Sequence, residues 1–262
     1  MSLRKCEDKG MENSIGEVKA IYQAACENEL PEFIKRFEFD ERSGVMKLVA
    51  SAKKRLDTLE KEKARIYELQ KYEREYSRYG YICGIDEVGR GPLAGPVVAG
   101  AVILPKDCNI LYINDSKQLS EKKREELYDI IMERAIACGI GYATPQRIDE
   151  INILQATYEA MRQAIDNLSV KPDVLLNDAV TIPHVNIRQV PIIKGDAKSI
   201  SIGAASIIAK VTRDRLMVEY DKVFPGYDFA GNKGYGSPAH IEALKEKGAT
   251  PIHRRSFIKN FV

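Results

Sequence analysis

The amino-acid sequence predicts an α/β protein in which helices flank a mixed β-sheet, preceded by a helical N-terminal extension. Residues 1–78 hold only three of the 18 glycines and one of the 11 prolines, and this scarcity of helix breakers favours helix. From residue 79 onward, short apolar runs are interleaved with helical patterns, which is typical of α/β folds. We therefore expect two domains, residues 1–78 and residues 79–262.

The extension has the pattern of helices that pack through one apolar face. Three helices are expected, near residues 15–28, 31–37 and 44–76. In the last of these, apolar residues recur at three- and four-residue steps from Val45 to Ile66, the periodicity of an amphipathic helix. Packing against another surface is the simpler interpretation of this helix. A basic face that binds nucleic acid, between residues 47 and 55, is the alternative.

The second domain begins with strands and then alternates strands with helices. Strands are expected near residues 81–85, 96–104, 138–143, 174–176 and 189–193. Helices are expected from the N-cap Ser120 onward and over residues 151–168, about 200–220 and 238–246. The change from a period of two to a period near 3.6 between these segments supports the assignment.

Composition excludes several classes of protein. The 262 residues are 44% hydrophobic and 30% charged, which suits a folded core. No run approaches the roughly 18 apolar residues of a membrane span, and the charged N-terminus lacks the apolar segment of a secretory signal. The five cysteines form no CxxC pair, which argues against a zinc ribbon or a disulfide framework and for a reducing cytoplasm. They are Cys6, Cys26, Cys83, Cys108 and Cys138.

The densest chemical signal follows the first predicted strand, where Asp86 and Glu87 lead into a glycine-rich turn. Carboxylates at the end of a core strand are costly unless something positive neutralises them, and their oxygens suit Mg²⁺ or Mn²⁺. Gly89 and Gly91 let the backbone approach a ligand, and Arg90 between them can contact phosphate. For the acid pair alone, an ordinary surface strand end is the simpler interpretation.

Two further acids follow apolar runs in the same way. Asp178 ends the run near residue 175, and Asp196 follows the run near residue 192. Either one alone could be a turn or cap residue. Together with the first acid pair, they predict four carboxylates at one sheet edge. Such a set can hold two metal ions for phosphoryl transfer, one activating water and the other stabilising the leaving oxygen.

Other enzyme classes fit the motifs less well. A nucleotide-dependent phosphotransferase could use the glycine-rich turn, but a P-loop ends in Gly-Lys-Ser/Thr and opens a helix. Here Gly91 is followed by Pro92 and a strand-like run, and the dinucleotide fingerprint also needs a helix after its third glycine. A serine or cysteine hydrolase is disfavoured because the chain has no Gly-x-Ser-x-Gly elbow and no cysteine in a reactive motif.

Residues 80–262 resemble the bacterial type 2 ribonucleases H, the ribonuclease HII family, along nearly their whole length. The resemblance rests on long blocks in the family's order. These blocks are residues 85–96, 114–117, 194–196, 204–214, 224–227, 233–236 and 253–257. The family implies a ribonuclease H-like fold and endonucleolytic hydrolysis of the RNA strand of RNA/DNA hybrids. It also implies a cut 5′ to a single ribonucleotide in duplex DNA, leaving a 3′-hydroxyl and a 5′-phosphate.

The resemblance also implies site residues by position. The family's catalytic acids, which bind Mn²⁺ or Mg²⁺, correspond to Asp86, Glu87, Asp178 and Asp196. The motif that senses the ribose 2′-hydroxyl, the group that separates RNA from DNA, corresponds to Gly89, Arg90 and Gly91. Tyr235 corresponds to the tyrosine that packs on the sugar next to the ribonucleotide.

Several other residues have both a functional and a simpler interpretation. Lys117 is either a phosphate contact near the acids or a surface lysine. Lys198 and Ser199 either contact phosphate or form an ordinary solvated helix start. Residues 253–255, His-Arg-Arg, predict a local basic tip that binds phosphate. Asn177 departs from the family, where an aliphatic residue is expected; it either hydrogen-bonds the neighbouring acid or marks a less buried edge.

We expect a cytoplasmic, monomeric, metal-dependent endonuclease that takes part in ribonucleotide excision repair. Its partners are RNA/DNA hybrids and DNA duplexes containing ribonucleotides, with no membrane. The alternative is a binding or repair-scaffold protein with an inactive centre, which the presence of all four acids disfavours. The extension resembles the helical N-terminal segment of some Gram-positive-type members, and it does not resemble the sheet-containing domain of type 3 enzymes.

Overall fold

The computed structural model describes residues 13–262. Cys6 and the charged N-terminal segment considered above lie outside the described residues. The chain divides into two compact units, residues 1–65 and residues 66–262, and each is described by itself.

The described part of the first unit is helical. It contains α1 (Ile15–Ala24), α2 (Leu30–Phe37) and most of α3 (Ser43–Leu69). Ser14 precedes α1 and forms a capping box with Glu17. The Ser14 hydroxyl accepts from the Glu17 N–H, and the Glu17 carboxylate accepts from the Ser14 N–H. The apolar faces of the three helices meet in one cluster. Its buried members are Val18, Ala25, Leu30, Phe33, Phe37, Val45, Val49 and Ala52.

The second unit is built on a mixed five-stranded sheet, as the sequence predicts. The strands are β1 (Ile82–Val88), β2 (Val97–Ile103), β3 (Ala137–Ala143), β4 (Val174–Asp178) and β5 (Arg188–Ile192). Their order is β3-β2-β1-β4-β5. The pairs β1·β2 and β2·β3 are antiparallel, whereas β1·β4 and β4·β5 are parallel. β1 runs further than predicted, so Asp86 and Glu87 lie within it.

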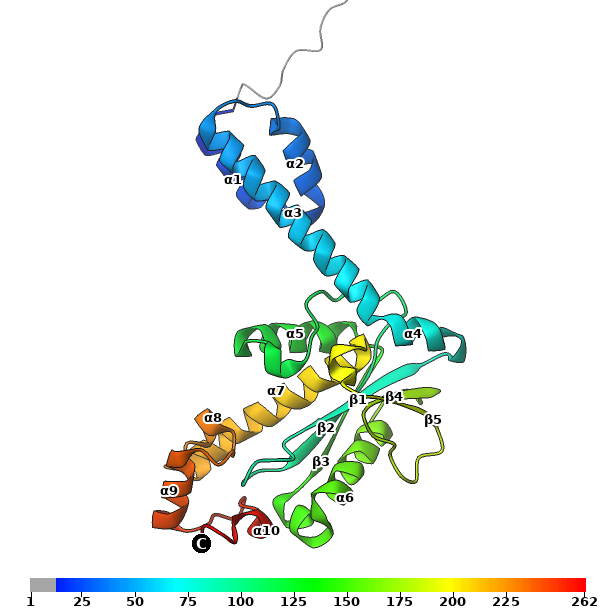
Figure 1. The fold of residues 1–262 in the computed structure, drawn as a ribbon, viewed down its shortest axis with the longest axis vertical. Helices are drawn as coiled ribbons and strands as arrows, with labels where there is room; N and C mark the ends of the chain where they lie inside the picture. The colour runs from blue at the N-terminus through cyan, green and yellow to red at the C-terminus, as the bar shows by residue number, and fades with distance from the viewer. Residues whose placement is uncertain (1–12) are drawn as a thin grey trace, which may run out of the picture. The chain divides into compact units, whose positions relative to one another are not determined.

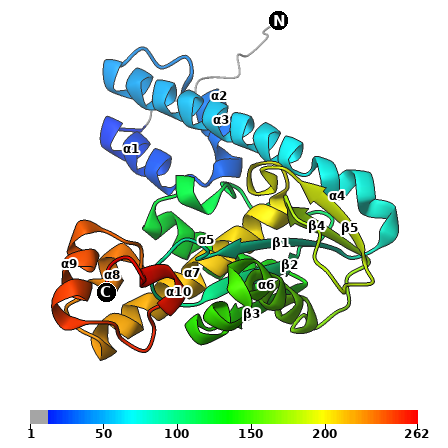
Figure 2. The same cartoon turned by 60° about the horizontal axis from the view of Figure 1, so that its bottom comes forward.

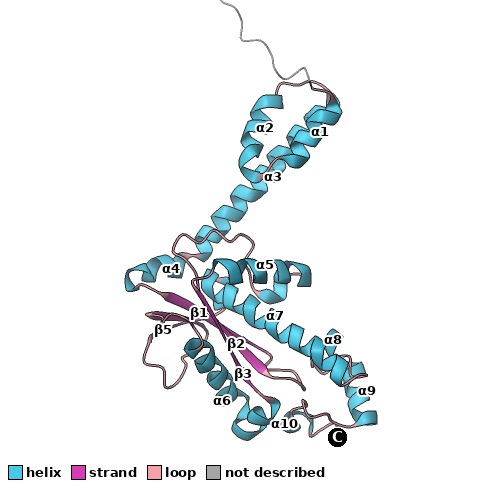
Figure 3. Cartoon of the chain, turned by 180° about the vertical axis from the view of Figure 1, so that it is seen from behind, coloured by secondary structure: helices cyan, strands magenta, loops and turns pink. Residues whose placement is uncertain are grey.

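Helices cover both faces of this sheet. α6 (Pro145–Asp166) packs on one face, and α7 (Ile200–Val223) with α5 (Glu121–Arg134) packs on the other. Figures 1 and 3 show the strands between α6 and α7. α7 lies directly on the sheet backbone, since a Cβ added at Gly84 would be 2.0 Å from the carbonyl carbon of Ser201. The start of α7 is therefore held close to β1.

The segment after residue 65 packs with the second unit. Ile66 and Leu69, at the end of α3, are buried in the cluster formed by α5, α7 and β2. α4 (Lys71–Tyr76) and η2 (Ser77–Tyr79) follow, and their tyrosines pack beside β1 and β4. The boundary that we predicted at residue 78 follows glycine content. In packing, residues 66–79 belong with the second unit, because their apolar side chains are buried in its core.

Three short helices complete the second unit. They are α8 (Phe229–Asn232), α9 (Pro238–Lys247) and α10 (Arg255–Ile258). α8 and α9 lie near the C-terminal end of α7 (Figure 2), whereas α10 packs against α6, where Asp149 accepts from the Arg255 and Ser256 N–H groups. Within residues 13–262, no helix combines the length and the apolar character needed to cross a bilayer.

Candidate active site

Two neighbouring strands and the turn after a third carry the four predicted acids. Asp86 and Glu87 lie in β1, and Asp178 is the last residue of β4. Ile85 pairs with Asn177 in the parallel β1·β4 ladder, so the acids that follow these two residues lie at the same edge. Asp196 lies in η4 (Gly195–Ala197), the turn that follows β5.

Hydrogen bonds connect this turn to the strands. The Gly195 N–H donates to Oδ1 of Asp178 over 2.7 Å. Because Asp196 follows Gly195 directly, this hydrogen bond holds Asp196 near Asp178. Asp86 accepts from the Glu87 N–H over 2.8 Å. Asp86 and Asp196 are only 5% and 8% exposed.

Burial and nearby carboxylates disfavour the charged forms of Asp86, Glu87 and Asp196. Burial raises the pKa of Asp86 well above its usual range, and the charges of Glu87 and Asp178 raise it further. Burial also raises the pKa of Glu87, partly offset by Arg90, whose guanidinium Nη1 lies 3.3 Å from Oε1 of Glu87. For Asp196, burial is again the largest cause of a raised pKa, followed by Asp115 and Asp178. In these three acids burial, strengthened by neighbouring carboxylates, favours the neutral form.

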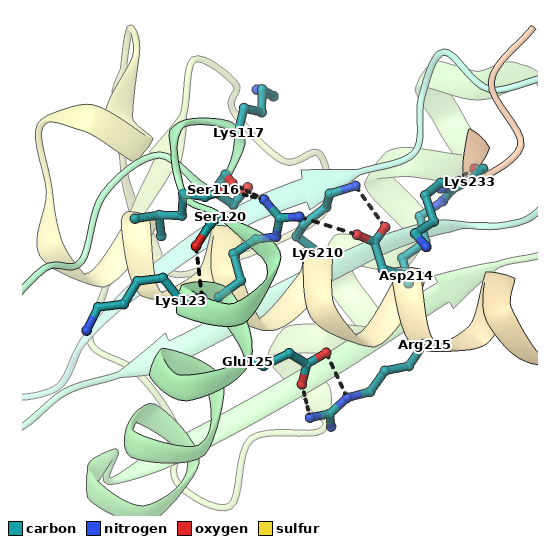
Figure 4. Close-up of polar contacts among 12 residues, drawn as sticks. Ser116, Lys117, Ser120, Lys123, Glu125, Lys210, Asp214, Arg215 and Lys233 are labelled. Atoms are coloured by element: carbon teal, nitrogen blue, oxygen red, sulfur yellow. Dashed lines mark hydrogen bonds and ion pairs between the residues drawn. The ribbon is translucent and has the colours of Figure 1, made fainter. Parts of the chain in front are cut away.

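Lys117 is the lysine nearest the acids in the predicted set. Its Nζ lies 3.9 Å from Oδ2 of Asp196, and its side chain is 78% exposed. Burial alone would lower its pKa, but Asp115, Asp86, Asp196 and Asp178 together outweigh burial and raise it. In Figure 4 Lys117 projects away from the ion pairs of α5 and α7, such as Lys210–Asp214 at 2.8 Å. Its ammonium is therefore available to a phosphate.

The donor set suits a hard divalent cation. All four side chains offer carboxylate oxygens, the ligands that Mg²⁺ and Mn²⁺ prefer. Burial raises the pKa of Asp86, Glu87 and Asp196, and a bound cation would favour their charged forms. Among the residues that the structure describes, no three acidic, histidine or cysteine side chains already surround one point as a metal would require. The four acids therefore suit a divalent cation by the chemistry of their oxygens and by their charge. Their side chains would have to come closer together to bind one.

A buried arginine, Arg254, holds the glycine-rich turn after β1 through hydrogen bonds. From the sequence, this residue is expected in a phosphate-binding tip. Arg254 is fully buried. It donates to the carbonyl oxygens of Arg90 (2.9 Å) and Gly95 (3.0 and 2.8 Å), and also to that of Gly89. Burial, together with the nearby charge of Arg213, lowers its pKa to about 9.

A second buried arginine, Arg213 of α7, supports the same turn. It donates to the carbonyl oxygens of Ala94 (3.1 Å) and Pro96 (2.9 Å). Gly89 has a φ of +89°, and a Cβ there would lie 2.3 Å from Nε of Arg213. Glycine is required at this position for both reasons.

The predicted basic tip at residues 253–255 is therefore wrong for two of its three members. His253 and Arg254 are 2% and 0% exposed, and only Arg255 faces solvent. The arginine is buried because the carbonyl groups of a turn more than 150 residues earlier in the chain supply its hydrogen bonds. Nothing in the local sequence reports such a partner.

Tyr235 lies beside the glycine-rich turn. It is 47% exposed, and a Cβ added at Gly91 would lie 3.7 Å from Cε1 of its ring. Its backbone is fixed by the preceding Gly234, whose carbonyl accepts from Leu93 N–H over 2.8 Å. The structure thus brings Tyr235, Gly91 and Arg90 to one exposed surface.

Two buried histidines, His240 and His253, form a chain of hydrogen bonds that ends at the backbone carbonyl of Tyr235. The Thr250 N–H donates to Nδ1 of His253 over 2.9 Å, so the proton of this ring is on Nε2. His253 then donates to Nε2 of His240 over 3.0 Å, and Nδ1 of His240 donates to the carbonyl oxygen of Tyr235 over 2.8 Å. Each ring in this relay carries one proton and is neutral.

The relay makes a prediction about acid stability. Burial, with the repulsion of His240, lowers the pKa of His253 to about 4 from its ordinary 6.5. The unfolded chain therefore binds more protons than the native chain between these two pH values, and stability falls as the pH is lowered through this window. The full effect is on the order of 3 kcal/mol. Urea unfolding in chelator between pH 7.5 and 4.5 should show a steeper decline for the wild type than for His253→Gln. Parallel curves would contradict the assignment.

Two predicted substrate contacts differ from each other in the structure. Lys198 is exposed and remains available to a phosphate. Ser199 is fully buried: its hydroxyl caps α7, accepts from the Ile202 N–H over 3.2 Å and donates to Glu73. Its side chain therefore serves the helix start and is not open to a substrate.

Asn177 matches neither alternative given for it. It is fully buried, and its Nδ2 donates to the carbonyl oxygen of Val180 (3.1 Å) and to Oε1 of Gln189 (2.8 Å). The amide thus points away from Asp178 and fastens the β4–β5 connection. Sequence reasoning also missed Glu73, Arg213 and Arg254. The sequence instead predicts Arg254 in the phosphate-binding tip, and no local signal identifies a buried charge.

Comparisons with known proteins agree with this architecture. The family model described as "Ribonuclease HII" matches residues 83–260, and "Ribonuclease HII N-terminal domain" matches residues 14–77. The ribonuclease HII of Lachnoclostridium phytofermentans is 72% identical over 86% of this chain and 89% of its own length. That of Clostridioides difficile is 51% identical over 96% and 99%. The crystal structure of ribonuclease H2 from Pyrococcus horikoshii superposes with a TM-score of 0.57 at 30% identity, covering 67% of this chain and 93% of that one.

Proposed function

This chain belongs to the ribonuclease HII family, a ribonuclease H that cleaves RNA paired with DNA, and we propose how its site does so. Asp86, Glu87, Asp178 and Asp196 form the reaction centre, and the chain cuts 5′ to a ribonucleotide, including a single one within duplex DNA. One observation carries the proposal. The four carboxylates lie together at one edge of the sheet, beside the turn that contains Gly89, and burial there raises the pKa of Asp86.

The acids would hold Mn²⁺ or Mg²⁺. Bound there, the metal supplies Lewis-acid chemistry that activates water and stabilises the leaving 3′ oxygen. The chain's own contribution is to fix the carboxylates: Gly195 holds Asp178, and the β1·β4 ladder fixes the spacing of the strand ends. Lys117 and Lys198 are exposed near Asp196 and would bind backbone phosphates.

Substrate selection would come from the glycine-rich turn and Tyr235. Several carbonyl groups of this segment point inward, where they accept hydrogen bonds from Arg213 and Arg254. The outer face of the segment would therefore be free to approach a ribose. Gly91 leaves open space beside the Tyr235 ring. A deoxyribose packed on that ring beside a 2′-hydroxyl at the turn would identify the RNA–DNA junction.

The direct test is cleavage of a DNA duplex with one embedded ribonucleotide, with Mg²⁺, with Mn²⁺ and with chelator. We expect metal-dependent cutting 5′ to the ribonucleotide, with 3′-hydroxyl and 5′-phosphate ends. A product ending in a 2′,3′-cyclic phosphate would mean that the 2′-hydroxyl is the nucleophile and would refute the mechanism. We further propose, from the cysteine pattern and the family, a cytoplasmic monomer that acts in ribonucleotide excision repair.

Tyr235 gives the substrate prediction a specific form. Tyr235→Ala should lower cleavage at a single ribonucleotide about 5- to 150-fold, since a stacking contact is worth roughly 1–3 kcal/mol. Tyr235→Phe should lose much less, because the ring face makes the contact. Both variants are assayed on a one-ribonucleotide duplex and on a full RNA/DNA hybrid, with melting temperatures. A loss equal on both substrates that follows the melting temperature would remove Tyr235 from the recognition surface.

A further inference from the structure

A carboxylate from α4 lies at the start of α7. Oε1 of Glu73 accepts from the Ser199 hydroxyl over 2.5 Å and from the Ser201 N–H over 3.0 Å. Free N–H groups and the helix dipole make this end of α7 favourable for a negative charge. Glu73 also lies within the residues matched by the family's N-terminal domain model, 14–77. The contact lies within the second unit, between α4 and the start of α7.

From this contact a continuous path of hydrogen bonds leads to the acids. The Ser199 N–H donates to the carbonyl oxygen of Gly195 over 2.9 Å. The Gly195 N–H donates to Oδ1 of Asp178 over 2.7 Å, and Asp196 is the next residue. Glu73 is thus connected through two residues to two of the four proposed ligands, although it is more than 100 residues away from them in sequence.

The environment of Glu73 is a costly one for a carboxylate. Its Oε2 and the hydroxyl of Ser201 are buried without a hydrogen-bond partner in the described structure. Both residues line a cavity of about 330 Å³, together with Gly80 and Cys108. Burial raises the pKa of Glu73, although its bonds to Ser199 and Ser201 oppose the shift. An apolar side chain would fill this position at less cost, so stability alone does not explain the residue.

We propose that Glu73 is a positioning residue, which fixes the start of α7 and thereby the turn that carries Asp196. The proposal rests on the function proposed above. While Glu73 holds the Ser199 hydroxyl, the Ser199 N–H bonds the Gly195 carbonyl and the Gly195 N–H bonds Asp178, so the turn that precedes and includes Asp196 is fixed at both of its peptide groups. Without Glu73, Ser199 loses its acceptor, and the turn at residues 195–198 gains freedom.

The test compares three variants on α4. Glu73→Ala removes both hydrogen bonds. Glu73→Gln keeps Oε1 as an acceptor for both donors and removes the charge. Glu75→Ala is the matched control, because Glu75 is exposed on the same helix and its loss changes the net charge equally. We expect Glu73→Ala to lower kcat about tenfold or more with KM changed less than threefold, and Glu73→Gln and Glu75→Ala to stay within about threefold of wild type.

Two readouts do not depend on activity. Amide hydrogen exchange at residues 195–199 should be at least tenfold faster in Glu73→Ala than in Glu75→Ala. The Mn²⁺ dissociation constant, measured by paramagnetic resonance of free Mn²⁺, should rise severalfold in the same comparison. The cavity allows a further check, since 100 mM acetate, with chloride as the control salt, should restore part of the kcat of Glu73→Ala by filling the vacated site.

The outcomes separate the two proposals. Exchange and Mn²⁺ affinity in Glu73→Ala equal to those of Glu75→Ala would overturn the positioning role, even if the melting temperature fell. If Glu73→Ala does not fold, Glu73→Asp, whose carboxylate is one methylene shorter, should show the same exchange difference from Glu73→Gln; equal exchange would overturn the role. A wild type without metal-dependent cleavage would instead refute the proposed function, and the exchange comparison would still decide on Glu73.

Discussion

Asp86→Asn should lower metal-dependent cleavage of an RNA/DNA hybrid about 10³-fold while the protein stays folded. The substitution removes one negative ligand and almost no volume from a residue that is 5% exposed. Metal ions stabilise the charge of such reactions by several kcal/mol, and each 1.36 kcal/mol is a factor of ten in rate. The measurement is single-turnover cleavage with saturating Mn²⁺ or Mg²⁺.

The same variant should be at least as stable as the wild type when metal is absent. Burial, with the charges of Glu87 and Asp178, raises the pKa of Asp86, so the native state disfavours the ionised carboxylate at neutral pH. The asparagine removes that cost. Melting temperatures in chelator and in Mn²⁺ should show that metal stabilises the wild type more than the variant. Asp129→Asn, on the exposed face of α5, is the control. Near-wild-type cleavage with full metal loading in Asp86→Asn would refute the role of this acid.

Arg254→Met should destabilise the protein by about 3–5 kcal/mol, because it leaves the carbonyl oxygens of a buried turn without a donor. The guanidinium makes four hydrogen bonds to residues 89, 90 and 95. Arg254→Lys keeps the charge but cannot present donors in a planar fork, so we expect it to recover only part of the loss. Urea unfolding measures both variants.

Arg255→Met is the matched control for Arg254, since the neighbouring side chain is exposed. We expect it to change the free energy of unfolding by no more than about 0.5 kcal/mol. Arg254→Met should also reduce cleavage beyond what its folded fraction explains, because the turn carries the proposed 2′-hydroxyl contacts. If Arg254→Met and Arg255→Met unfold at the same urea concentration, the turn does not depend on Arg254.

The sheet and the four acids could be predicted from the sequence because their signals are local. β2 and most of β1 and β4 are short apolar runs, and Asp178 marks the end of β4. The mixed pairing, which sets β1 between an antiparallel and a parallel neighbour, brings these local features to one edge. The family blocks extended the inference to Tyr235 and the glycine-rich turn.

The buried charges could not be predicted, because their partners are distant in the chain. Arg254 is separated from Gly89 by 165 residues, and Glu73 from Ser199 by 126. A charged residue is most often solvated, and periodicity contains no information on a carbonyl or hydroxyl partner so far away. Ser199 illustrates the consequence: its position beside Lys198 suggested a phosphate contact, whereas its hydroxyl is occupied inside the protein.

The packing of residues 66–79 against the second unit has a consequence for how relatives of this chain could exchange parts. A chimera joined at the change in composition near residue 79 would combine Ile66, Leu69 and the α4 tyrosines of one parent with the core of another. Apolar surfaces that were selected separately would then have to fit. A junction between residues 65 and 66 keeps each core with its own parent. We therefore expect a chimera joined between residues 65 and 66 to be more stable than one joined near residue 79.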